Sequence, residues 1–239
     1  MKNLILLFLL SFTVVSHASE SVELSSPDID ISDHKSLERG AKNYVTYCLG
    51  CHSIQHIRYL RIALDLDIDE KKMLHEIAPE GAGIYDKLQT AMNAHDARKW
   101  FGVQPPDLSL IARSRGADWL YSYLKGFYSD SSKPLGVNNS IFPDVGMPNV
   151  LWQLQGEQQA VYKTEDGKKV LAKLVIAEKG VQSEKEFDQT VNDLVNFLVY
   201  VGEPVQLERQ KMGKFVIFFI LMFLVVAYLL KKEYWKDVH

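Results

Sequence analysis

The stretch Tyr47-Cys48-Leu49-Gly50-Cys51-His52-Ser53 decides what this chain folds around. Two cysteines separated by two residues and followed at once by histidine form the attachment pattern of a c-type haem. The thiols of Cys48 and Cys51 add across the two vinyl groups of one porphyrin. On a helical turn this spacing leaves His52 under the iron, where it supplies an axial nitrogen. We therefore predict one covalently bound haem c.

Two other uses of such a cysteine pair are a thioredoxin-like dithiol and half of a zinc site. A redox dithiol belongs in a βαβ setting, whereas the residues around this pair are patterned as helix. A zinc site needs four ligands, but the sequence holds two cysteines and no histidine pair at ligand spacing. Both alternatives are weaker than haem attachment.

Residues 1–18 have the pattern of a secretory signal peptide, with a basic start, an apolar run and a small-x-small site at Ser16-His17-Ala18. We expect export, which suits a c-type haem because such haems are attached outside the cytoplasm. An uncleaved N-terminal anchor is the minor alternative. The formal charge of −3 becomes about −4 without Lys2, and we expect no nucleic-acid partner.

A hydrophobic run at about residues 212–230 predicts a transmembrane helix. A helix of this length rises about 28 Å, enough to cross a bilayer. Lysines and arginines are divided evenly between its two ends, so orientation rests on the signal peptide. We predict a periplasmic haem domain over residues 19–204, then a membrane anchor with a short cytoplasmic tail over residues 205–239. A buried core helix is the alternative.

The haem domain is expected to be mainly helical. A helix is predicted from about His34, with one apolar face that ends at the haem and contains Leu37, Ala41, Tyr44 and Cys48. Ser183 and Glu186 form a capping box that begins a second amphipathic helix, which extends to about residue 201. We expect this second helix to cross the first at Gly40, where the absence of a side chain permits close approach.

The remaining segments carry weaker patterns. Residues 53–104 are interpreted as an insertion of short helices and loops, and residues 160–176 as a small β-hairpin turning at Asp166-Gly167. Within the insertion an acidic cluster is interpreted as a solvated face, with partner docking as the alternative; it comprises Asp65, Asp67, Asp69 and Glu70. Three histidines are assigned to the surface: His56, His75 and His95.

An iron with one histidine ligand needs its sixth position filled or left open. Outside the signal peptide and the anchor region, the methionines are Met73, Met92 and Met147. Met147 lies in an irregular segment, residues 129–149, where Pro148 stiffens the chain next to it. Met147 is therefore favoured as the second axial ligand, and the other two remain open at this point.

Pro105-Pro106-Asp107-Leu108-Ser109 predicts a rigid, extended segment. Arg113 and Arg115 follow it, ahead of a helix over residues 117–127 whose aromatic side chains we assign to a core around the porphyrin. An arginine beside a haem edge would pair with a propionate through two hydrogen bonds. Composition alone is equally compatible with surface arginines.

These features together resemble the cytochrome c1 family, the c-haem subunit of ubiquinol–cytochrome c oxidoreductase (the bc1 complex), in its bacterial form. The haem motif is shared by many families, whereas the Pro-Pro segment, the methionine loop and a single C-terminal anchor in this order are more specific. The resemblance spans nearly the whole chain after residue 18 and rests on Arg39-Gly40-Ala41 with Tyr44, Cys48 to Ser53, Arg58-Tyr59 with Arg61, Trp100-Phe101-Gly102, Pro105 to Ser109, Ala112 to Gly116, Gly146-Met147-Pro148 and Lys232 to Asp237.

The resemblance implies a cytochrome c-like haem domain with insertions and a small β-hairpin, mainly α, plus one C-terminal transmembrane helix. It also implies that Met147 is the sixth iron ligand, that Arg115 pairs with a propionate and that Pro106 lies in the haem pocket. Some relatives carry an additional cysteine pair that forms a disulfide, and this chain has none.

The implied function is one-electron transfer from a Rieske iron–sulfur subunit to a c-type cytochrome. The implied setting is the bacterial inner membrane, in a dimeric complex with a cytochrome b subunit and with lipid around the anchor. Quinol oxidation would belong to the partner subunits, so this chain is not expected to be catalytic alone. Alternatives are a membrane-anchored cytochrome serving an oxidase or nitrite reductase, and a haem-based gas sensor or peroxidase with an open iron position.

Overall fold

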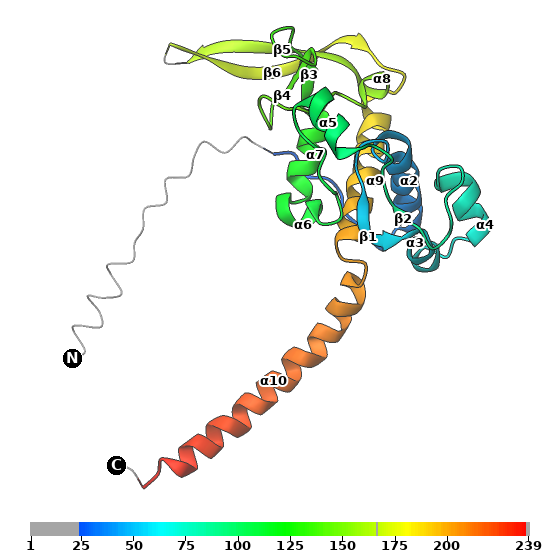
Figure 1. The fold of residues 1–239 in the computed structure, drawn as a ribbon. Helices are drawn as coiled ribbons and strands as arrows, with labels where there is room; N and C mark the ends of the chain where they lie inside the picture. Colours follow the sequence, from blue (N-terminus) through cyan, green and yellow to red (C-terminus); the bar gives the residue numbers. More distant parts are fainter. Residues whose placement is uncertain (1–23, 166, 238–239) are drawn as a thin grey trace.

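The structure, a computed structural model, describes residues 24–165 and 167–237, so the predicted signal peptide lies outside the described residues. A mainly helical domain is followed by one long C-terminal helix (Figure 1). The helices and strands follow the order α2 (His34–Tyr47), β1 (Ile54–Arg58), α3 (Tyr59–Asp65), α4 (Glu70–Lys72), the π-helical turn η1 (Met73–Ile77), β2 (Lys87–Leu88), α5 (Ala94–Phe101), α6 (Ile111–Arg115), α7 (Ala117–Lys125), β3 (Phe127–Ser129), β4 (Val137–Asn139), α8 (Trp152–Gln155), β5 (Gly156–Glu165), β6 (Lys168–Lys179), α9 (Glu184–Gly202) and α10 (Gln206–Tyr234).

Helices α2 and α9 cross in contact at Gly40. A Cβ atom added to Gly40 would lie 2.1 Å from the carbonyl oxygen of Asp193 and 2.6 Å from Cβ of Phe197. No larger residue fits there unless the helices separate. The predicted inner face of α2 is buried, and α9 begins with the predicted capping box of Ser183 and Glu186. The predicted face, cap and crossing point are all confirmed.

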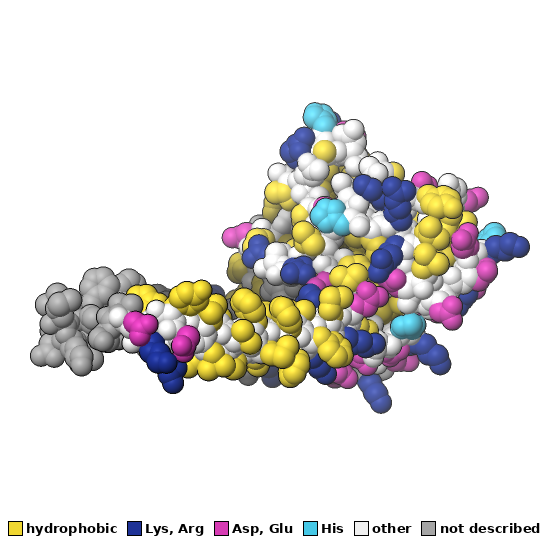
Figure 2. Space-filling view, turned by 90° about the horizontal axis from the view of Figure 1, so that it is seen from below, with side chains coloured by type: hydrophobic (Ala, Val, Ile, Leu, Met, Phe, Trp, Pro, Cys, Tyr) yellow, Lys and Arg dark blue, Asp and Glu magenta, His cyan; other side chains and the backbone are white. Residues whose placement is uncertain are grey.

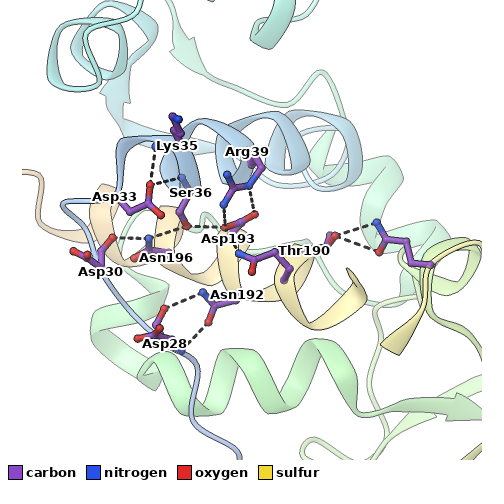
Figure 3. Close-up of polar contacts among 12 residues, drawn as sticks. Asp28, Asp30, Asp33, Lys35, Ser36, Arg39, Thr190, Asn192, Asp193 and Asn196 are labelled. Carbon is purple, nitrogen blue, oxygen red and sulfur yellow. Dashed lines mark hydrogen bonds and ion pairs between the residues drawn. The ribbon is translucent and has the colours of Figure 1, made fainter. Parts of the chain in front are cut away.

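A buried carboxylate lies at this crossing (Figure 3). Asp193 is 2% exposed and accepts hydrogen bonds from Arg39 through both Nε (2.6 Å) and Nη2 (2.8 Å). Ser36 Oγ donates to it at 2.7 Å and Gln189 Nε2 at 2.9 Å. Four donors thus satisfy the buried charge, and charge-assisted bonds of this kind are among the strong ones. They join α2 to α9 beside the apolar contact.

The lead-in segment before α2 is fastened to α9 by asparagine side chains (Figure 3). Asn192 accepts from the backbone N–H of Asp28 at 2.7 Å and donates to its carbonyl at 2.8 Å. Asn196 Nδ2 donates to the carbonyl of Asp30 at 2.8 Å. Residues 24–30 have no regular secondary structure, and these hydrogen bonds from asparagine side chains to their backbone atoms hold them in place.

Residues 53–104 contribute more to the core than an insertion would. Their helices are short, as predicted, but β1 and β2 pair antiparallel, with Ile54 opposite Leu88. This sheet was not predicted from the sequence. The segment supplies several fully buried side chains to the same core as α2 and α9: Ile54, Tyr59, Ile62, Met73 and Leu88. It is therefore a structural part of the domain.

Two further strand pairs extend from the helical core. The hairpin predicted at residues 160–176 is confirmed and longer, since β5 and β6 pair from Gly156 opposite Lys179 to Glu165 opposite Lys168. Asp166 in its predicted turn lies outside the described residues. The segment 129–149, predicted to be irregular, begins with a short pair in which β3 lies antiparallel to β4. The rest of the segment, residues 130–136 and 140–149, is irregular as predicted.

The C-terminal helix α10 extends beyond the predicted span of 212–230 at both ends. Among the described residues it is the one helix long and apolar enough to cross a membrane, and none of its apolar window is buried. Figure 2 shows an almost continuous apolar surface along this helix, with charged side chains towards its ends. A helix of this kind is suited to a lipid environment.

Candidate haem site

An apolar cavity of about 270 Å³ lies between the end of α2, helices α6, α7 and α9, and the irregular segments on either side of them. Its walls are mainly aliphatic and aromatic, including Phe101, Val103, Leu194 and Leu198. All six residues predicted for the site border this one cavity: Cys48, Cys51, His52, Pro106, Arg115 and Met147. The chain thus brings together residues that lie as far apart in sequence as positions 48 and 147.

The end of α2 positions the two thiols. The backbone N–H groups of Cys51 and His52 both donate to the carbonyl of Cys48, at 3.0 and 2.8 Å, so a tight turn puts the three side chains on one wall. Both cysteines are free. Burial raises the pKa of Cys48 to about 12 and also raises the pKa of Cys51. Neutral thiols are poor metal ligands, and the described residues contain no group of three or more His, Cys, Asp or Glu able to hold a metal ion.

The imidazole of His52 is oriented by the Pro-Pro segment. Its Nδ1 lies 2.7 Å from the carbonyl oxygen of Pro106. A carbonyl can only accept, so Nδ1 carries the proton and Nε2 is left with a free lone pair. Burial lowers the pKa of His52 and favours the neutral ring, although the Pro106 carbonyl opposes this. Pro106 was predicted as part of the pocket, but the role of its carbonyl in orienting His52 was not predicted.

A second hydrogen bond fixes the backbone of the same turn. The hydroxyl of Tyr44 donates to the carbonyl of His52 at 2.6 Å. Tyr44 is fully buried in the core beside Phe197. The position of His52 therefore depends directly on the packing of α2 against α9.

Met147 borders the cavity and lies in the irregular stretch of residues 140–149 that follows β4. The hydroxyl of Tyr123, on α7, donates to its sulfur at 3.4 Å. Of the other two candidates, Met73 is fully buried in η1, and Met92 lines a separate, smaller cavity. Of the methionines that the structure describes, Met147 is the one placed to donate a thioether here.

Tyr123 is the residue that the sequence analysis missed. It was assigned to the core, yet its hydroxyl faces the methionine sulfur while its ring stacks on Trp119 at 4.8 Å between centroids. Burial raises the pKa of Tyr123 to about 12, so the hydroxyl stays a donor. The helical spacing that marks it in the sequence is the same for any core aromatic.

Arg113 and Arg115, the two candidate arginines, have different surroundings in the structure. The Arg115 guanidinium lies 5.0 Å from the ring centroid of Trp119 and 6.0 Å from that of Phe142, at the cavity. Within the described ranges no carboxylate pairs with it, whereas Arg113 pairs with Glu203 at 3.1 Å. Arg115 is therefore the cation available to a ligand in the cavity.

The exposed acids and histidines stay outside this site. Asp67, Asp69 and Glu70 are exposed, as are the three predicted surface histidines. Asp65 is only partly exposed and accepts hydrogen bonds from Arg61 Nε and from Tyr200 Oη, both at 2.7 Å. Asp69 caps α4 through its side chain.

These residues fit a haem. The cavity offers apolar walls, two neutral thiols, a neutral imidazole nitrogen, a thioether and one unpaired cation, which is the donor set that such a group requires. The fold and the donor set are those expected of a membrane-anchored cytochrome of the c type. The model of the Cytochrome C1 family matches residues 28–238, and the chain belongs to this family.

Several relatives align with most or all of this chain. Cytochrome c1 of Allochromatium vinosum is 47% identical over 244 residues, with all of both chains covered. The ammonia monooxygenase gamma subunit of Nitrosomonas europaea is 43% identical, with 100% of this chain and 98% of that protein covered. In Neurospora crassa, a mitochondrial cytochrome c1 named as a haem protein is 28% identical, over 85% of this chain and 62% of that protein.

A solved structure titled as a hyperthermophilic respiratory complex III aligns with all of this chain and 95% of its own. Its TM-score is 0.45 and its identity 18%, so nothing further rests on it. Family membership itself implies a haem cofactor.

Proposed function

We propose that this chain is the c-type cytochrome of a bc1 complex and carries single electrons from a Rieske iron–sulfur subunit to a c-type cytochrome. The observation that supports this most strongly is the convergence of Cys48, Cys51, His52 and Met147 on one apolar cavity in a member of the Cytochrome C1 family. When bound, a haem supplies one-electron redox chemistry. The chain itself makes no bond in a substrate, so quinol oxidation belongs to its partners.

Each residue has a distinct role in this proposal. Cys48 and Cys51 would hold one haem through thioether bonds, and His52 Nε2 and Met147 Sδ would ligate its iron. The Pro106 carbonyl holds the imidazole in the tautomer that leaves Nε2 free. The guanidinium of Arg115 would form a bidentate ion pair with a propionate of the haem. The thioether favours the reduced state and raises the potential.

The proposed topology has the haem domain in the periplasm, α10 across the inner membrane and the C-terminus in the cytoplasm. The signal peptide of residues 1–18 and the boundary after residue 204 are part of this proposal, and α10 begins at Gln206, next to that boundary. A cytochrome b subunit would lie beside α10, with lipid on the remaining surface, in a dimeric complex. The exposed apolar surface of α10 supports this arrangement (Figure 2).

Gentle detergent extraction and purification through a C-terminal tag test the assignment. We expect a b-type cytochrome and a Rieske protein to co-purify with this chain, together with ubiquinol–cytochrome c reductase activity. Recovery with a copper oxidase, a nitrite reductase or a monooxygenase in place of these partners would contradict the proposal. The monooxygenase outcome matters because one relative at 43% identity bears the name of such a subunit.

Carbon monoxide binding to the reduced, purified protein separates electron transfer from gas sensing and peroxidase chemistry. A filled sixth position excludes the gas, so we expect no rapid change in the spectrum. Rapid binding would favour the sensor or peroxidase.

A further inference from the structure

The segment that carries Met147, residues 139–147 (the methionine segment), is held at its start by two buried asparagines in β4. Asn138 is 6% exposed and Asn139 1%. In the β3–β4 pair they lie opposite Tyr128 and Phe127. A buried amide is costly unless it is hydrogen bonded, so its partners indicate what it holds.

The side chain of Asn139 joins α7 to the beginning of the methionine segment. Its Nδ2 donates to the carbonyl of Tyr123 at 2.8 Å. Its Oδ1 accepts from the backbone N–H groups of Ile141 and Phe142, at 2.9 and 3.1 Å. One amide thus satisfies an end carbonyl of α7 and two N–H groups that no strand partner reaches.

Tyr123 on α7 also contacts the other end of this segment, at Met147. The carbonyl of Tyr123 accepts a hydrogen bond from Asn139 Nδ2, and its hydroxyl donates one to the sulfur of Met147. The chain from 139 to 147 therefore leaves Tyr123 and returns to it. Both ends of this loop depend on one position of α7.

Two features show that the path between these ends is tightly defined. Asp144 has φ +61, a left-handed conformation that is uncommon outside glycine, and its N–H donates to Asn138 Oδ1 at 2.9 Å. At the start of the path, a Cβ added to Gly126 would lie 2.5 Å from Ser140 Oγ. Gly126, directly after α7, therefore packs closely against Ser140, directly after β4, and a side chain at position 126 would displace its neighbours.

We propose that Asn139 is a positioning residue for the Met147 ligand: it ties the methionine segment to α7 so that the thioether remains at the cavity. Without the Asn139 amide, Ile141 and Phe142 lose their acceptor and the segment loses its attachment to Tyr123. The sulfur then leaves the iron part of the time. This inference rests on the proposed role of Met147 as the sixth ligand.

The test compares Asn139→Ala, Asn139→Asp and the control Asn192→Ala in the purified complex. Asn192 likewise donates to and accepts from the backbone, but it binds Asp28 in the lead-in segment and not the segment that carries Met147. The readouts are the sulfur-to-iron charge-transfer band of the ferric protein, the midpoint potential and carbon monoxide binding. A residue that contributes only to stability would not move these three while the protein remains folded.

For Asn139→Ala we expect loss or strong weakening of the band, a lower potential and rapid carbon monoxide binding. Asn139→Asp keeps the acceptor but places a carboxylate oxygen against the Tyr123 carbonyl, so an intermediate effect is expected; it decides the matter if the alanine variant fails to accumulate. Asn192→Ala should leave all three readouts unchanged. An unchanged band and potential in the Asn139 variants would overturn the inference, as would an equal loss in Asn192→Ala.

A Met147→Leu variant separates this inference from the proposed function. If the wild-type protein lacks the band, or Met147→Leu retains it, the ligand assignment itself fails. If Met147→Leu loses the band and Asn139→Ala keeps it, only the positioning role of Asn139 fails.

Discussion

Replacing Gly40 by alanine tests whether the α2–α9 crossing holds the site together. The added Cβ would lie 2.1 Å from a carbonyl oxygen of α9, where an ordinary contact is 3.4–4 Å, so the helices must separate by more than 1 Å. Overpacking of this kind destabilises the fold by up to about 3 kcal/mol. Alanine offsets about 1 kcal/mol of this, because it favours a helix more than glycine does. The net loss is then about 2 kcal/mol, which for a chain of this size lowers the melting temperature by roughly 4–8 °C.

Circular dichroism of the detergent-purified protein, at a fixed heating rate, measures this loss. The matched control is Gly213→Ala in α10, where an added Cβ meets no atom within 4 Å. The control should be neutral or slightly stabilising, because only the propensity of the helix changes. A Gly40→Ala variant that melted at the wild-type temperature, or that behaved like the control, would show that the crossing does not depend on the missing side chain.

Three further outcomes are expected. Met147→Leu should lower the midpoint potential, because leucine offers no sulfur to the iron, whereas Met92→Leu should not; equal shifts in potentiometric titrations would contradict the ligand assignment. Asp193→Asn should cost about 2 kcal/mol, less than for a fully buried ion pair because Arg39 is 48% exposed on its side chain; denaturant unfolding that matches the wild type would count against this. If the exposed acids at residues 67–70 attract a basic acceptor, turnover with that acceptor should fall steeply with ionic strength, and a flat profile would remove the idea.

Features that a short stretch of sequence determines by itself were predictable. The buried face of α2, the capping box at Ser183 and the apolar surface of α10 each follow from local periodicity or from one side chain bonding its own helix end. The attachment motif is local too. The five residues from Cys48 to His52 contain both thiols and the imidazole, so no distant contact was needed to identify it.

Features that depend on distant backbone atoms were not predictable. The β1–β2 pair is only a few residues long, and Ile54 meets Leu88 across an intervening 33 residues that carry no strand signal. The Pro106 carbonyl that orients His52 and the Tyr123 carbonyl held by Asn139 are backbone groups, which every residue possesses. Nothing in the residue types marks these carbonyls, because the fold alone brings them to their partners.

Every role proposed for this chain depends on covalent binding of one haem by Cys48 and Cys51 within the cavity. The most direct measurement is the intact mass of the chain after denaturation and extraction with acidified organic solvent, compared with a variant in which both cysteines are alanine. We expect the wild-type chain to keep the mass of one haem and the variant to keep none. A wild-type chain that loses all pigment under these conditions would contradict it.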